Sequence, residues 1–180
     1  MKDVVFITGN ERKADYLAQY LGIPVEHVKM ELDEIQSLDF TEVVRHKVRQ
    51  AYIRVDRPVL VEDSGLEFAS FGRLPGTFSK SFIHEIGLEA MCRLVDGRDR
   101  SATVRCVFGY FDGEHEAYFE GSMSGTIAEH PVGKSGFGFD TIFIPEGYKV
   151  TRAELSEDDD RKTYLRIKPF EQVKEFLLSR

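Results

Sequence analysis

The order of apolar and polar residues predicts that strands and helices alternate in the first third of the chain. Short apolar runs rich in β-branched residues are typical of strands, and apolar side chains at helical spacing are typical of helices. Asp39, followed by Glu42, has the pattern of a helix cap. The elements predicted in this region are a strand at 3–8, a helix at 13–21, a strand at 25–30, a helix from 39 to about 55 and a buried strand at 59–61.

The rest of the chain predicts a hairpin flanked by helices. Two long strand-like segments surround Asp112 and Gly113, which favour a tight turn and so indicate an antiparallel pair. The elements predicted here are helices at 79–86 and 88–95, strands at 101–111 and 115–127, a glycine-rich loop at 133–138, a strand near 141–144, a helix opening at Ser156 and an amphipathic helix from about Pro169. Together these elements predict an α/β fold with a mixed β-sheet. No repeat or linker divides residues 1–180, so a single domain is expected.

Charge and composition narrow the class of partner. The chain of 180 residues has a formal net charge of −7, which argues against binding to a nucleic-acid backbone or an anionic membrane. A small polyphosphate is compatible with this charge if a local group of cations and a divalent metal hold it. No apolar segment approaches the length of a membrane span, and Met1 to Val5 lack the features of a signal peptide, so a cytoplasmic protein is expected. Cys92 and Cys106 lie among apolar neighbours and are expected in the core.

Thr8-Gly9-Asn10 and Lys13 form a first candidate site, where a strand passes into a helix. Backbone N–H groups at the start of a helix attract anions, and Lys13 adds a full positive charge in the first turn. The alternative is an ordinary capped helix, because strand–glycine–helix turns are common in α/β proteins. Both interpretations stay open at this point.

Two pairs of carboxylates form a second candidate site. Asp33 and Glu34 follow a predicted strand, and Glu62 and Asp63 follow the strand at 59–61, at an edge where open α/β sheets bind ligands. Mg2+ bound to a nucleotide takes one or two protein carboxylates, so Glu34 and Asp63 would suffice. A carboxylate near the metal would also orient and deprotonate the attacking water. Asp33 and Glu62 are interpreted as solvated loop charges.

Other residues have a structural interpretation beside a functional one. Lys47 and Lys80, taken singly, are ordinary surface lysines. Phe137 and Phe139 beside Asp140 are typical of core packing, or of a shelf on which a base stacks.

Residues 128–135, Ala-Glu-His-Pro-Val-Gly-Lys-Ser, nearly match the spacing of a phosphate-binding P-loop. A working P-loop requires a helix that starts at its Lys-Ser pair, and here Gly136, Phe137 and Gly138 follow, which are poor helix residues. A P-loop is therefore not expected. The acidic run at 157–160 is interpreted as the first turn of a helix capped by Ser156.

These features occur together, and in the same order, in one known family. From about Phe6 to Leu155 the chain resembles the inosine/xanthosine triphosphate pyrophosphatases, which remove noncanonical purine nucleotides. The motifs that carry the resemblance are Thr8-Gly9-Asn10-x-x-Lys13, Leu32-Asp33-Glu34-Ile35-Gln36, Val61-Glu62-Asp63-Ser64-Gly65-Leu66, Leu74-Pro75-Gly76, Ser124-Gly125-x-Ile127 and Gly136-Phe137-Gly138-Phe139-Asp140 with Phe143 and Pro145. The resemblance implies an elongated, two-lobed α/β structure with a deep central cleft, usually as a homodimer. It also implies that the chain hydrolyses a nucleoside triphosphate to the monophosphate and pyrophosphate, with Mg2+ as cofactor.

The resemblance further implies roles for the residues that match its motifs. Asp63 and Lys13 would be catalytic, and Glu34 and Asp63 would bind the metal. The residues expected to contact the substrate are Thr8, Gly9, Asn10, Lys13, Lys47, Ser64, Lys80, Phe137, Phe139, Asp140 and Arg166. The asparagine and the lysines would contact phosphate, whereas the aromatic residues and Asp140 would flank the base and the sugar.

The chain departs from the family pattern after Ala153-Glu154. Family members place a Ser-His-Arg triplet there, which reads the keto groups of the deaminated base, whereas this chain has Tyr164-Leu165-Arg166. Loss of the imidazole removes a hydrogen-bond donor from base recognition. The usual Asp-Pro is Asp140-Thr141, and a lysine expected before the triplet is replaced by Asp160 or displaced to Lys162.

Three hypotheses of function are compatible with these residues. The leading one is a pyrophosphatase for inosine and xanthosine triphosphates. The second is a related pyrophosphatase that prefers another base, and the third is a nucleotide-binding module without turnover. Glu34, Asp63 and the three lysines favour catalysis.

Overall fold

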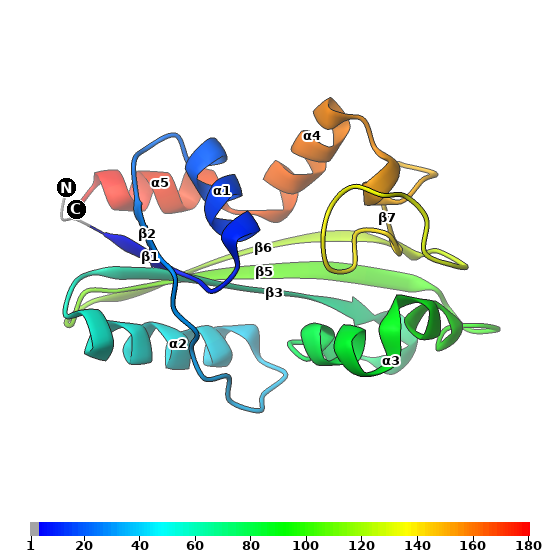
Figure 1. Ribbon diagram of the computed structural model, residues 1–180, viewed down its shortest axis with the longest axis horizontal. Coiled ribbons are helices and arrows are strands. Elements are labelled where there is room, and N and C mark those ends of the chain that lie inside the picture. Colours follow the sequence, from blue (N-terminus) through cyan, green and yellow to red (C-terminus); the bar gives the residue numbers. More distant parts are fainter. Residues whose placement is uncertain (1–3) are drawn as a thin grey trace. The chain divides into compact units, whose positions relative to one another are not determined.

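Within residues 4–180, which a computed structural model describes, a seven-stranded sheet is combined with five α-helices (Figure 1). The strands are β1 (Val5–Ile7), β2 (Glu26–Val28), β3 (Val59–Phe68), β4 (Pro75–Gly76), β5 (Ser101–Phe111), β6 (Glu116–Ile127) and β7 (Phe143–Pro145). The helices are α1 (Glu11–Tyr20), α2 (Phe40–Val55), α3 (Ser79–Arg93), α4 (Glu157–Ile167) and α5 (Phe170–Leu178), with short 3₁₀ turns η1 (Ala69–Phe71) and η2 (Arg152–Glu154).

The sheet is mixed, as the sequence predicts. The strand order is β2-β1-β3-β5-β6-β7, and β4 pairs with β3 off this path. β1 pairs in parallel with β2 and β3, whereas β4 pairs antiparallel with β3 and β7 antiparallel with β6. The α/β class is therefore confirmed.

The chain forms two compact units. Of the described residues, unit 1 contains 4–63, 106–120 and 168–180, and unit 2 contains 64–105 and 121–167. In unit 1, α2 lies on one face of the strands, and α1 and α5 lie on the opposite face (Figure 1).

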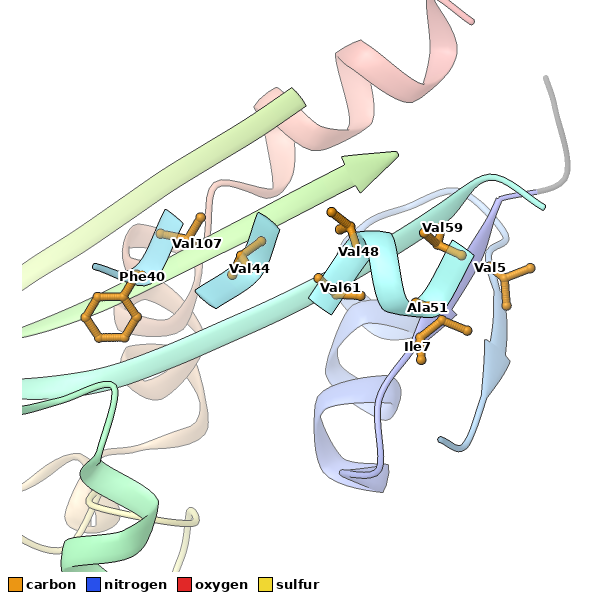
Figure 2. Close-up of a cluster of buried hydrophobic side chains, with 9 residues drawn as sticks. All are labelled: Val5, Ile7, Phe40, Val44, Val48, Ala51, Val59, Val61 and Val107. Carbon is orange, nitrogen blue, oxygen red and sulfur yellow. The ribbon is translucent and has the colours of Figure 1, made fainter. Parts of the chain in front are cut away.

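The core of unit 1 lies between α2 and the strands. Val44, Val48 and Ala51 on α2 are fully buried against valine and isoleucine side chains of the sheet (Figure 2). Close packing requires a small residue on β5. A Cβ atom at Gly109 would lie 2.3 Å from Cγ1 of Val44, so glycine lets the helix approach the strand.

The opposite face of the same strands packs against α5. Successive residues of a strand point to opposite faces, so Phe6 faces away from Val5 and Ile7. The Phe6 ring lies 6.3 Å from that of Phe108, which in turn lies 5.6 Å from Phe170 on α5. Both faces of the central strands in unit 1 are therefore covered by helices.

Most predicted elements are present, with shifted ends. The strand predicted at 3–8 is β1, and Asp3 lies outside the described residues. The two helices predicted at 79–86 and 88–95 are α3, which is kinked at Gly87, where φ is 78°. No helix follows the Lys134-Ser135 pair until residue 152, so this part of the described chain is not a P-loop.

β3 is much longer than the strand predicted at 59–61, because charged residues continue the strand where an apolar run would be expected to end. Glu62 and Asp63 therefore lie inside a strand and not in a loop. Each is paired with lysine, which makes their burial tolerable.

Two further expectations concern single residues and membrane spans. Cys92 and Cys106 are free thiols and fully buried, as predicted. Within residues 4–180 no helix has the length and hydrophobicity needed to cross a lipid bilayer.

Candidate active site

Two lysine–carboxylate clusters lie in unit 1, one on each face of β3. Glu62 and Asp63 are consecutive, so their side chains point to opposite faces of the sheet. Both residues are buried, with 6% and 7% of their surface exposed. Each carboxylate is met by lysine from the segments that cover its own face.

The first cluster joins Asp63, Lys47 and Glu34. The Lys47 ammonium lies 2.7 Å from Oε1 of Glu34 and 2.8 Å from Oδ1 of Asp63. α2 holds Lys47 in place because the buried residues Val44 and Val48 fix the same side of the helix on the sheet. Two carboxylates around one ammonium leave a net negative charge, which favours binding of a further cation.

The donor atoms of this cluster fit a magnesium ion held jointly with a phosphate group. Oδ2 of Asp63 is buried and has no hydrogen-bond partner, and the Glu34 side chain is 45% exposed. Among residues 4–180, no group of three or more His, Cys, Asp or Glu side chains could hold a metal ion alone. Two carboxylates are the number that Mg2+ typically takes from protein when phosphate oxygens and waters complete its coordination.

The second cluster joins Glu62, Lys13 and Lys168. The Glu62 Oε1 atom lies 3.1 Å from the Lys13 ammonium and 2.6 Å from the Lys168 ammonium. Burial raises the pKa of Glu62, but the charges of Lys13 and Lys168 outweigh it and lower the pKa to about 2. Burial likewise lowers the pKa of Lys168, and the neighbouring Cys106 and Glu62 raise it further than burial lowers it. The cluster carries one excess positive charge, which suits a phosphate group near the start of α1.

The turn between β1 and α1 caps the helix. Oδ1 of Asn10 accepts hydrogen bonds from the backbone N–H groups of Arg12 at 3.1 Å and Lys13 at 3.3 Å. Oγ1 of Thr8 accepts one from the N–H of Asn10 at 3.1 Å. These three amides are already satisfied by side chains, so the positive charge offered here comes chiefly from the Lys13 side chain.

Unit 2 contains the predicted aromatic residues. Phe137 and Phe139 are half-buried, and Asp140 is 4% exposed. One Asp140 oxygen accepts a hydrogen bond from the N–H of Phe137 at 2.9 Å, and the other accepts one from Arg152 at 3.1 Å. The loop is therefore closed around the Asp140 carboxylate.

The remaining predicted contacts of unit 2 differ in exposure. Lys80 lies exposed in the first turn of α3, and Ser64 is half-buried on β3. On α4, Tyr164 is 1% exposed, whereas Leu165 is 39% exposed. Arg166 is exposed and lies 3.4 Å from Glu146. In unit 2, the arginine of the predicted triplet is therefore open to solvent, whereas the tyrosine is part of the core.

Comparison with known proteins gives the family of the chain. The Ham1 family matches residues 4–176. The chain belongs to the Ham1 family. A Yarrowia lipolytica protein named inosine triphosphate pyrophosphatase is 37% identical over 180 residues, with 97% of this chain and 95% of that protein covered. A Saccharolobus solfataricus protein named dITP/XTP pyrophosphatase is 37% identical over 177 residues, covering 96% and 92%. The structure of a HAM1 protein from Coxiella burnetii matches with a TM-score of 0.85 at 25% identity, and each chain is covered completely.

The geometry shows where several of the residues predicted for this Ham1 chain lie. Asp63, Glu34 and Lys47 are brought together, and the Asp33 side chain is 81% exposed, as a solvated charge should be. The interpretation of Glu62 as a solvated loop charge is wrong, because its carboxylate is buried between two lysines.

Two buried cations of this Ham1 chain were not among the predicted residues. Lys168 pairs with Glu62, from which 106 residues separate it, and Arg152 pairs with Asp140 and Asp160. The only hint for Lys168 is its place between the apolar Ile167 and Pro169, which is unusual for a solvated lysine. Arg152 lies beside an alanine in a short turn, and no sequence pattern indicates that it is buried.

Proposed function

We propose that the chain hydrolyses noncanonical purine nucleoside triphosphates, such as ITP, dITP and XTP, to the monophosphate and pyrophosphate. Such an activity removes abnormal bases from the nucleotide pool. The observation that carries the proposal is the Lys47 ammonium shared by Glu34 and Asp63, with a buried oxygen of Asp63 left without a partner. The names of the full-length relatives support the same chemistry.

Asp63 and Glu34 are proposed to hold Mg2+, which when bound supplies positive charge to the phosphate oxygens. The Lys47 ammonium lies within hydrogen-bond distance of both carboxylates, so it stands beside any group that they bind. Asp63 is also proposed to orient and deprotonate the water that attacks the phosphorus. Burial of its carboxylate keeps that oxygen in one orientation.

Lys13 is proposed to bind phosphate and to stabilise charge that develops during cleavage. Its side chain is 14% exposed, and its ammonium lies 3.1 Å from Oε1 of Glu62. Because Lys168 already offsets the charge of Glu62, the charge of Lys13 stays available to an anion. The other proposed phosphate contacts are Asn10, Lys47 and Lys80. Thr8, Gly9 and Ser64 are proposed to contact the substrate as well.

Phe137, Phe139, Asp140 and Arg166 are proposed to contact the nucleoside. Half-buried aromatic rings offer a face for base stacking, and the exposed guanidinium of Arg166 offers donors to a keto group. A central cleft, a homodimer and a cytoplasmic location also stay predictions.

A related pyrophosphatase with a different base preference is the second candidate. Tyr164 is buried and Leu165 is apolar, so of the predicted triplet only Arg166 presents an exposed polar group on α4. A base that needs fewer hydrogen bonds than a deaminated purine would then be accepted.

Pyrophosphate release from a panel of triphosphates tests both candidates. The panel contains inosine, xanthosine and the ordinary ribonucleoside triphosphates together with dTTP, each with magnesium and with chelator. Fast, magnesium-dependent cleavage of the inosine and xanthosine nucleotides is expected. Preference for another nucleotide would favour the second candidate, and tight binding without release would favour a binding module.

A further inference from the structure

Arg152 is a buried cation of unit 2. Its side chain is 6% exposed, and its two terminal nitrogens pair with different carboxylates. One lies 3.1 Å from Oδ1 of Asp140 and the other 2.6 Å from Oδ1 of Asp160. The guanidinium also lies over the ring of Tyr164, 5.6 Å from its centroid. None of the chemistry proposed above uses this residue.

The backbone around Arg152 is held firmly. Arg152 begins the turn η2, whose preceding residue Thr151 forms a capping box with Glu154. Oγ1 of Thr151 donates a hydrogen bond to the carbonyl of Val132 at 2.8 Å. On α4, Asp160 and Tyr164 are four residues apart and therefore share the side that faces Arg152. The backbone that carries the guanidinium is therefore fixed in position.

Asp140, one of the two partners of Arg152, fixes the conformation of the aromatic loop at 136–140. Asp140 accepts the N–H of Phe137 with its second oxygen, and a Cβ atom at Gly136 would lie 2.5 Å from that oxygen. The loop is also tied to the arginine segment, because Oγ of Ser135 donates to the carbonyl of Ala153 at 2.5 Å. The backbone N–H of Ala153 donates in turn to the carbonyl of Asp140 at 3.2 Å. A change in the Asp140 carboxylate would therefore move Phe137.

We propose that Arg152 is a positioning residue for nucleoside recognition. It holds Asp140, and through it Phe137, in the orientation that receives the base and sugar, while Asp160 holds Arg152 from the other side. The inference rests on the proposed function, in which the loop contacts the nucleoside and not the phosphates. Loss of the Arg152 fork should therefore weaken binding of the nucleoside and leave binding of the polyphosphate unchanged.

Arginine suits this task because a planar guanidinium can pair with two carboxylates at once, whereas lysine is a single point charge. Arg152→Lys keeps the buried positive charge and removes the fork, so it tests position with little risk to folding. Asp160→Asn is a second variant that loosens Arg152 without touching Asp140. Arg161→Lys, the same change at an exposed site on α4, is the matched control.

The experiment compares steady-state hydrolysis of inosine triphosphate with inhibition by inorganic tripolyphosphate, which has no nucleoside. We expect Arg152→Lys to raise KM about tenfold and Asp160→Asn about threefold, with kcat and the tripolyphosphate inhibition constant unchanged within about twofold. Arg161→Lys should match the parent protein. An unchanged KM in Arg152→Lys would overturn the proposal, and so would a tripolyphosphate inhibition constant that rises as much as KM, since that pattern marks general damage to the site.

Hydrogen exchange separates this inference from the proposed function. The amide of Phe137 should exchange about tenfold faster in Arg152→Lys than in the parent protein, because its acceptor is no longer held. If the parent protein releases no pyrophosphate, the proposed function fails and equilibrium binding replaces kinetics. Faster exchange with weaker binding of inosine triphosphate, and unchanged binding of tripolyphosphate, would still support the role of Arg152. Unchanged exchange, or no effect on nucleotide binding, would overturn it.

Discussion

Glu62 and Asp63 are neighbours on β3, yet one carboxylate is paired with two ammonium groups and the other shares a single ammonium with Glu34. The pairing decides what each can do. Glu62 has its charge fully offset, so it serves to hold Lys13 and Lys168. Asp63 keeps one buried oxygen without a partner, and is therefore the carboxylate suited to a metal ion or a water molecule.

Asp63→Asn should abolish hydrolysis and spare the fold. The amide keeps the shape of the side chain and loses the charge that binds metal and accepts a proton, so kcat should fall at least about 100-fold. The measurement is pyrophosphate release, with thermal unfolding as the check on folding. Asp33→Asn, at a carboxylate that is 81% exposed, is the control and should leave turnover nearly unchanged. Near-normal turnover in Asp63→Asn would contradict the proposed role of Asp63 in binding metal and accepting a proton.

Lys168→Met should destabilise the protein. The change removes one of the two cations beside a fully buried carboxylate, which costs about 3 kcal/mol in the free energy of unfolding. Lys162→Met removes a lysine whose side chain is 70% exposed, and should cost less than about 0.5 kcal/mol. Urea unfolding of both variants checks the contrast. Equal losses would mean that the pairing of Lys168 with Glu62 contributes little.

Glu62 should make stability fall in acid. Its pKa is about 2 in the folded protein and 4.5 when unperturbed, so the unfolded chain takes up the proton first. The resulting stabilisation, about 3 kcal/mol, is complete above pH 4.5 and is lost as the pH falls towards 2. Urea unfolding at pH 5 and pH 3 should show a larger loss in the parent protein than in Glu62→Gln, by about 2 kcal/mol. Parallel losses in the two proteins would contradict a depressed pKa.

Magnesium should be required, and Glu34 should set its affinity. A chelator should stop pyrophosphate release, and added Mg2+ should restore it. Glu34→Gln removes one of the two carboxylates and should raise the magnesium concentration for half-maximal rate about tenfold. The measurement is rate against free Mg2+ for both proteins. A variant with an unshifted magnesium curve would exclude Glu34 as a ligand.

Lys134→Ala should leave activity intact within about twofold, because this lysine is exposed and no helix begins at Lys134-Ser135. The check is kcat and KM for the preferred nucleotide. Loss of activity comparable with that of Asp63→Asn would revive the P-loop alternative.

The fold could be predicted well wherever a single periodicity governs a segment. The strands and helices up to residue 61 and the hairpin around Asp112 follow from apolar spacing and turn residues. β3 could not be delimited in this way, since Glu62 and Asp63 look like the end of a strand until their lysines are known. Local pattern does not report a partner that comes from a distant segment.

The residues of the candidate site likewise fall into those that the sequence could indicate and those that depend on partners from distant segments. Asp63, Glu34 and Lys47 could be selected because their motifs match a known family. Lys168 and Arg152 could not, because each owes its importance to burial beside carboxylates that only the folded chain brings near. The sequence likewise does not reveal exposure, since the neighbours Tyr164 and Leu165 on α4 are 1% and 39% exposed.

The distance along the chain between Glu62 and Lys168, 106 residues, has a consequence for synthesis on the ribosome. β3 leaves the exit tunnel long before Lys168 is made, so for much of translation Glu62 lacks one of its two cations. The N-terminal strands and α2 have the residues to form a core during that time, but the face of β3 that carries Glu62 cannot be completed. A nascent chain of this protein should therefore pass through a stage at which the charge of Glu62 is not yet buried. Its own last segments, or a chaperone, must then cover that charge.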